Sequence, residues 1–147
     1  MSGVVVGYDG SACGDAALRW AAYEARLRGV TLRVISAVAQ RHVPAQLSSS
    51  VYVDPPEENL TAAREHVDAA LSRLRAEMGE SEMPEIDVSV PIGNAGALLV
   101  DASRTADLLV VGSTGNNIWI QLMLGSVSTH HAPRALPGDR RPIIGWN

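Results

Sequence analysis

The chain has 147 residues, of which 46% are hydrophobic and 19% are charged, and its formal net charge is -4. This length suits one domain with one core, and the composition is that of a globular protein rather than a disordered or fibrous one. The negative charge disfavours nonspecific binding to nucleic acids or acidic membranes, because both need a basic surface.

The beginning of the chain and its single cysteine bear on where the protein works. A strand-like run starts by residue 3, without the charged and apolar regions of a secretory signal. No apolar run reaches the ~18 residues that a membrane span needs. Cys13 has no second cysteine to pair with, which fits a reducing compartment. We therefore expect a cytoplasmic protein.

Strand-like and helix-like segments alternate along the first half of the chain. Residues 3–9 are a continuous apolar strand, as expected when both faces of a sheet are covered. We predict that Ser11 caps a helix ending at Gly29, and that residues 30–38 form the second strand. Residues 40–55 show no sustained period and carry proline and serine, so we predict a loop or lid there.

The clearest amphipathic helix opens at Pro56 and stops at Gly79. Apolar residues recur within it at the spacing of one helix face. They are Leu60, Ala63, Val67, Ala70, Leu71, Leu74 and Met78. We expect this face to pack on the core.

Two further strands complete the alternating pattern. Residues 86–92 are predicted as the third strand, Asn94 caps a short helix through about Arg104, and residues 107–112 form the fourth strand. Strands separated by helices imply right-handed βαβ crossovers. With residues 142–146 as the last strand, we therefore expect residues 1–147 to form a single α/β domain, an open twisted five-stranded parallel sheet with helices on both faces.

Glycines at strand ends indicate where a ligand would bind. The strands of residues 3–9 and 107–112 both run into glycine-bearing loops. In such sheets ligands bind beyond the carboxyl ends of the strands, where the strand order reverses. A later Gly125-Ser126 turn, predicted to open a helix, presents unpaired N–H groups and a hydroxyl, which suit an anion such as phosphate.

The spacing Gly112-x2-Gly115-x9-Gly125-Ser126 resembles the nucleotide-binding motif of ATP-binding universal stress proteins. VVVGYDGS, VTLRVISAV and VPIGNAGALLVDASRTADLLVVGSTG resemble family segments in the same order, so that the similarity covers roughly residues 2–128. The resemblance implies a Rossmann-like sheet, of the adenine nucleotide alpha hydrolase-like type, with strand order 3-2-1-4-5. It also implies a nucleotide-responsive regulatory or stress-response protein that binds ATP with Mg²⁺ and hydrolyses it little or not at all.

The resemblance further assigns roles within one crevice. Asp9 would lie beside the ribose or a magnesium ion, Ala37 against the adenine, and residues 112–128 around the phosphates. The cofactor-binding residues that it indicates are Gly7, Tyr8, Asp9, Gly10, Ser11, Ala37, Val111, Gly112, Ser113, Gly115, Gly125, Ser126, Val127 and Ser128. Position 127 is valine where some members have a hydroxyl, so only Ser126 and Ser128 carry side-chain oxygens in that turn.

Simpler interpretations apply to several of these residues. Glycines at strand ends also serve as plain turn residues. Asp9 can cap the turn that follows it, and Ser11 can act only as a helix cap. Cys13, near a helix start, is either a reactive thiol or a small buried residue. Trp119 either stacks on a ligand or packs onto the core.

Missing motifs restrict the mechanism. The chain has no GxxxxGK[ST] loop, and no lysine, arginine or histidine lies between Gly112 and Ser128. Backbone N–H groups and a bound cation would have to offset the charge of a triphosphate. No convincing general base is found, so we expect at most a slow ATPase. The alternatives are a family member that has lost nucleotide binding and acts as a dimeric interaction module, and a slow adenylyl- or phosphoryl-transfer enzyme.

The carboxyl-terminal sequence departs from the family pattern. Pro133, Pro137 and Gly138 are predicted to end the helix after Ser126 within about two turns, leaving residues 142–146 as the last strand. In many relatives that edge strand pairs with its copy in a second subunit. We expect a homodimer here too, weakened because Pro142 removes one hydrogen-bond donor, and we expect a protein partner that the sequence does not identify.

Overall fold

The computed structural model describes residues 3–44, 50–112 and 143–146. Its main element is a five-stranded sheet with the strand order β5-β2-β1-β6-β7, in which every neighbouring pair is parallel. The strands are β1 (Val4–Gly7), β2 (Leu32–Ile35), β5 (Ile86–Ser89), β6 (Leu108–Gly112) and β7 (Ile143–Trp146). Counted along the chain, these five strands stand in the order 3-2-1-4-5. The predicted α/β architecture with a parallel sheet is confirmed.

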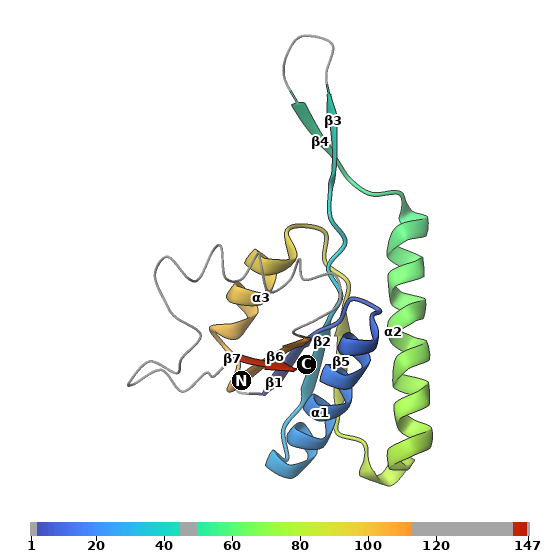
Figure 1. Cartoon of the computed structure of the whole chain (residues 1–147), viewed down its shortest axis with the longest axis vertical. Coiled ribbons are helices and arrows are strands. Elements are labelled where there is room, and N and C mark those ends of the chain that lie inside the picture. The colour runs from blue at the N-terminus through green and yellow to red at the C-terminus, as the bar shows by residue number, and fades with distance from the viewer. Residues whose placement is uncertain (1–2, 45–49, 113–142, 147) are drawn as a thin grey trace.

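Helices cover both faces of this sheet. Figure 1 shows α1 and α2 on one face and α3 on the other. Their bounds are α1 (Ala12–Arg28), α2 (Glu57–Met78) and α3 (Ala95–Ser103), and a short 3-10 helix, η1 (Glu80–Glu82), follows α2. The predicted caps are confirmed at both ends of α1. The hydroxyl of Ser11 accepts a hydrogen bond from the Gly14 N–H at 3.0 Å, and Gly29 takes a left-handed φ of 65°.

Strands β1 and β6 are apolar throughout because successive residues face opposite helical layers. Within β1, Val4 and Val6 belong to the cluster that packs under α1 and α2, whereas Val5 belongs to the cluster under α3. Leu109 and Val111 of β6 pack with Leu99 of α3 in that second cluster. These two central strands are therefore buried on both faces, whereas the edge strand β5 keeps Asp87 exposed.

The prediction of a loop or lid over residues 40–55 is wrong in part. β3 (Arg41–Pro44) and β4 (Ser50–Val53) form a two-stranded antiparallel hairpin. The Gln40 side chain donates a 2.9 Å hydrogen bond to Asp54 beside the paired strands. The β-branched and aromatic run of residues 51–53 favours a strand. The prolines and serines around this run obscured it, although proline is tolerated in an edge strand.

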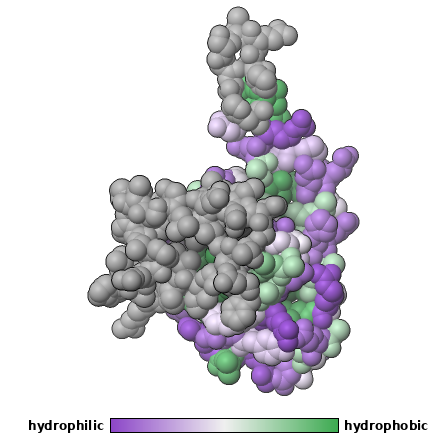
Figure 2. All heavy atoms as spheres, viewed as in Figure 1, coloured by the Kyte–Doolittle hydropathy of each residue, from purple (hydrophilic) through white to green (hydrophobic). Residues whose placement is uncertain are grey.

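This hairpin stands away from the sheet (Figure 1) and carries apolar side chains into solvent. Val51 is 51% exposed and Tyr52 67% exposed. In Figure 2 the described part of the hairpin includes a hydrophobic area next to strongly hydrophilic residues. Its role differs from that of the buried sheet, since these side chains do not contribute to the core.

Helix α2 divides into two unequal halves. Its buried residues begin at Val67 and end at Met78, whereas none of residues 57–66 is buried. Figure 1 shows α2 continuing past the beginning of α1 toward the hairpin. Because α1 starts where β1 ends, the amino-terminal half of α2 overhangs the carboxyl ends of the strands.

Candidate functional site

The chain reverses direction immediately after β1. Gly10 takes a φ of 80°, a conformation that glycine adopts without strain. Asp9 accepts hydrogen bonds at Oδ1 from the backbone N–H of Ser11 at 3.0 Å and from its hydroxyl at 2.6 Å. Asp9 therefore caps the turn, as the simpler interpretation holds, and Ser11 in turn caps α1. The exposed carboxylate of Asp9 still lies beside the crevice described below.

A missed residue makes this turn sterically possible. A Cβ on Gly14 would lie 2.6 Å from Asp9 Oδ1, so a larger residue there would displace the carboxylate. Gly14 falls inside a helix, where glycine is disfavoured by about 1 kcal/mol relative to alanine. A glycine at such an unfavourable position indicates a close contact that leaves no room for a side chain.

Tyr8 lies under the turn rather than in it. Its side chain is 2% exposed, and its hydroxyl donates a 2.7 Å hydrogen bond to Asp15. Burial and this hydrogen bond raise the pKa of Tyr8 to about 12, so that its hydroxyl keeps its proton to a higher pH than an exposed tyrosine does. Tyr8 thus joins the end of β1 to the first turn of α1.

The end of β6 is shaped by packing. A Cβ on Gly112 would lie 3.0 Å from both the carbonyl carbon and the oxygen of Cys13 and 3.2 Å from its Cβ. The missing side chain lets α1 begin against the end of β6. Gly112, the first glycine of the predicted motif, therefore has a structural reason that is independent of any ligand. Cys13 itself is partly exposed rather than buried.

A cavity of about 260 Å³ lies at the carboxyl ends of β1 and β2. Its lining comes from the turn after β1, from the residues after β2 and from the overhanging half of α2. The residues are Tyr8, Asp9, Gly10, Ser36, Ala37, Ala63 and His66. The cavity thus brings together four of the predicted site residues: Tyr8, Asp9, Gly10 and Ala37.

Other predicted site residues are placed elsewhere. Gly7, Ser11, Val111 and Gly112 do not line this cavity, and Val111 packs in the core under α3. Ser113, Gly115, Gly125, Ser126, Val127 and Ser128 lie outside the described residues, as does Trp119.

Sequence reasoning missed three of the lining residues: Ser36, Ala63 and His66. Ala63 was assigned to the core-facing stripe of α2, and Ser36 sits in the predicted strand of residues 30–38. Ser36 is 8% exposed, and its N–H donates to the carbonyl of Ser89 at 3.0 Å. No local pattern distinguishes His66, since its position depends on how far α2 extends beyond the sheet.

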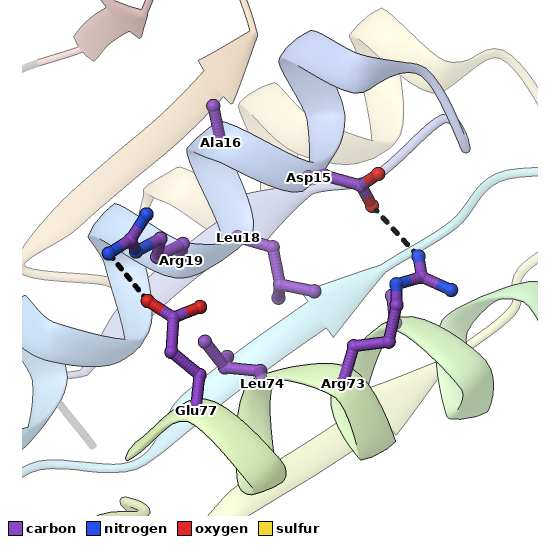
Figure 3. Close-up of a pocket in the computed structure, with 8 residues that line it drawn as sticks. Asp15, Ala16, Leu18, Arg19, Arg73, Leu74 and Glu77 are labelled. Atoms are coloured by element: carbon purple, nitrogen blue, oxygen red, sulfur yellow. Dashed lines mark hydrogen bonds and ion pairs between the residues drawn. The ribbon is translucent and has the colours of Figure 1, made fainter.

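A second cavity, of about 310 Å³, lies between α1 and α2 (Figure 3). Ion pairs join the two helices across it, from Arg19 to Glu77 at 2.5 Å and from Arg73 to Asp15 at 3.4 Å. These charges are already matched within the chain, and the cavity lies alongside the helices rather than at the strand ends. For these two reasons, the cavity between α1 and α2 is a weaker candidate for a ligand site than the cavity at β1 and β2.

A metal would have few protein ligands in the described part of the chain. No group of three or more His, Cys, Asp or Glu side chains gathers there in a way that could hold a metal ion. Among the described residues that line the cavity at β1 and β2, Asp9 offers a single carboxylate. Within the same residues, none of the helices has the length and apolar character needed to cross a bilayer.

The universal stress protein family model matches residues 1–135 of this chain. Universal stress protein Rv2624c of Mycobacterium tuberculosis is 33% identical over 135 residues, which are 92% of this chain and 46% of that protein. Universal stress protein Rv2623 of the same organism is 31% identical over 151 residues, covering 97% of this chain and 49% of its own length. The chain thus spans about half the length of the curated relatives it matches.

Solved structures agree in fold. A universal stress protein in complex with cAMP matches with a TM-score of 0.64 and 20% identity, covering 99% of this chain and 96% of the other. The universal stress protein from Archaeoglobus fulgidus in complex with dAMP gives a TM-score of 0.63 and 20% identity, covering 100% and 98%. At this identity the likeness concerns the fold alone.

Proposed function

Because this chain belongs to the universal stress protein family, we propose that it binds an adenine nucleotide at the carboxyl ends of β1 and β2 and acts as a nucleotide-responsive regulator. The observation that carries the proposal is the cavity lined by Asp9, Gly10 and Ala37. It lies beside the point where the strand order reverses, where ligands of such sheets bind. Two structural neighbours, in complex with cAMP and dAMP, support adenine nucleotides as the ligand class.

The proposed ligand is ATP with Mg²⁺. Ala37 lies against the adenine, Asp9 beside the ribose or the cation, and residues 112–128 around the phosphates. The absence of a basic side chain between Gly112 and Ser128 gives Mg²⁺ a larger share in neutralising the triphosphate. The Asp9 carboxylate either lies beside the ribose or completes the magnesium coordination, directly or through water.

A fast enzyme is not proposed. The chain lacks the P-loop lysine, and no water-positioning base is evident in its sequence. We expect ATP turnover far below the ~1–10³ s⁻¹ of ordinary enzymes. The protein is proposed to work in the cytoplasm through a state that depends on bound nucleotide.

An interaction module is the second proposed function, and the exposed hairpin favours it. Val51 and Tyr52 present apolar surface away from the core, which is typical of a contact surface.

We also propose a homodimer through the edge strand β7. Deletion of residues 142–147 is expected to convert the dimer to a monomer in light scattering, and a truncated protein that stays dimeric would place the interface elsewhere.

Calorimetric titration with ATP tests the main proposal. ATP is expected to bind appreciably more tightly with Mg²⁺ than in EDTA, because the cation offsets the phosphate charge. Acid extraction of the purified protein is expected to release a compound with adenine absorbance. No binding of ATP, AMP or adenosine under either condition would reject the nucleotide proposal and leave the interaction module.

A further inference from the structure

The amino-terminal half of α2 carries an apolar stripe that the core does not cover. Leu60 and Ala63 continue the helix face of Val67, yet both are only partly buried while Val67 is fully buried. His66 follows this stripe and is exposed. Ala63 and His66 both line the cavity at the ends of β1 and β2. The overhang of α2 therefore faces a space that a ligand can fill.

The size of this cavity limits what it can hold. Its volume of about 260 Å³ is below the range of about 300–1,000 Å³ typical of sites for drug-sized ligands. A complete nucleoside triphosphate would extend beyond it. The cavity can hold one end of such a ligand, either the nucleoside or the phosphates.

Charge favours the nucleoside end. Among the described residues that line the cavity there is no arginine, and the chain has no lysine at all. The carboxylate of Asp9 lies at the cavity and repels phosphate oxygens, whereas it accepts hydrogen bonds from ribose hydroxyls. Tyr8 offers no free hydroxyl to a ligand, since that group is bonded to Asp15. Phosphates are thus better accommodated outside the cavity.

We propose that the overhang of α2, residues 57–66, is one wall of a purine nucleoside subsite, with the base against the methyl group of Ala63 and the imidazole ring of His66. This inference rests on the proposed nucleotide binding and deepens it by adding a wall that the glycine motif does not contain. The small side chain of Ala63 leaves room for the flat base, and the aromatic ring of His66 stacks on it. Ala37, after β2, contributes a second small side chain to the same cavity.

Titration calorimetry with adenosine, AMP and Mg²⁺-ATP tests this assignment. His66→Ala is expected to lower the affinity for all three ligands by the same factor, about tenfold, because the lost stacking involves only the base. His66→Phe keeps an aromatic ring and is expected to retain most of the affinity. Ala63→Phe fills the space and is expected to abolish binding of all three ligands.

Thr61→Ala is the matched control, since Thr61 is exposed on the same half of α2 and does not line the cavity. It is expected to leave all three affinities unchanged. Thermal melting identifies any variant that fails to fold. Should Ala63→Phe do so, the comparison of His66→Ala with His66→Phe decides the question, because His66 is exposed and makes no contribution to the core.

Three results would overturn the assignment while leaving nucleotide binding intact. One is a His66→Ala variant that binds adenosine as tightly as the unaltered chain does. Another is a loss that grows from adenosine to ATP, because it would place His66 at the phosphates. The third is a His66→Phe variant as weak as His66→Ala, which would exclude stacking. An unaltered chain that binds none of the three ligands would instead reject the proposed function itself.

Discussion

The two halves of α2 share one apolar stripe but differ in what the stripe does. From Val67 to Met78 its residues are no more than 9% exposed and pack on the sheet and on α1. Leu60 and Ala63 lie on the same stripe and are not buried. Periodicity thus identifies the face of a helix that avoids water, but not where along the helix the core ends.

Lengths explain where the core ends. Helix α2 has 22 residues, which corresponds to about 33 Å at the usual rise. Strands β1 and β2 have four residues each, which span only about 13 Å. A helix this much longer than the strands it covers must extend past them. The overhang lies at the carboxyl ends because α2 begins on that side and runs back to the start of β5.

The same substitution in the two halves gives the largest expected contrast. Leu74→Ala removes a buried side chain, 5% exposed, and is expected to lower the free energy of unfolding by about 2–5 kcal/mol. Leu60→Ala removes a partly exposed one and is expected to cost about 0.5 kcal/mol. Urea denaturation of both variants measures the difference. Equal losses would mean that the stripe is one continuous core.

Much of the fold of helices and strands could be predicted because the residues that begin and end its helices act locally in the sequence. Ser11 and Asn94 cap helices with their own side chains, and Gly29 ends α1 in a left-handed conformation. The site could be predicted only in part. Asp9 follows an apolar strand, Ala37 was implied by the family resemblance, and both line the cavity, whereas the position of His66 depends on the relative lengths of helix and strand. The prediction of residues 30–38 as one strand hid that difference, since β2 covers only Leu32–Ile35.

A second prediction concerns packing at the same end of the sheet. Gly112→Ala places a Cβ against the backbone of Cys13 and is expected to destabilise the fold by about 1–3 kcal/mol. Adenosine affinity of the folded variant is expected to be unchanged, since Gly112 does not line the cavity. Thermal unfolding and calorimetry together check this. Full stability with weakened adenosine binding would show the reverse, a ligand role without a packing role.

The third prediction concerns Tyr8, under the cavity. Tyr8→Phe removes the hydrogen bond to Asp15 and is expected to cost about 1–2 kcal/mol at neutral pH. The folded chain holds the hydroxyl proton up to a pKa of about 12, whereas the unfolded chain releases it near 10. Between these values the unfolded state binds fewer protons, so stability falls as the pH rises. The difference in the free energy of unfolding between the unaltered chain and Tyr8→Phe is therefore expected to become smaller above pH 10.

Denaturation at a series of alkaline pH values measures this effect, and the absence of lysine from the chain leaves few other groups that titrate there. Tyr23→Phe is the control, because Tyr23 is 39% exposed on α1. Its alkaline profile is expected to follow that of the unaltered chain. A Tyr8→Phe variant that loses stability in parallel with the unaltered chain would contradict the role of the Tyr8 proton.

The central claim is that the overhang of α2, rather than its packed half, faces the ligand. Amide chemical shifts during titration with adenosine test it most directly. The account predicts the largest shifts at Gly10, Ala37, Ala63 and His66, with little change along the packed half of α2. Shifts concentrated instead at Arg73, Leu74 and Glu77, around the cavity between α1 and α2 (Figure 3), would contradict it.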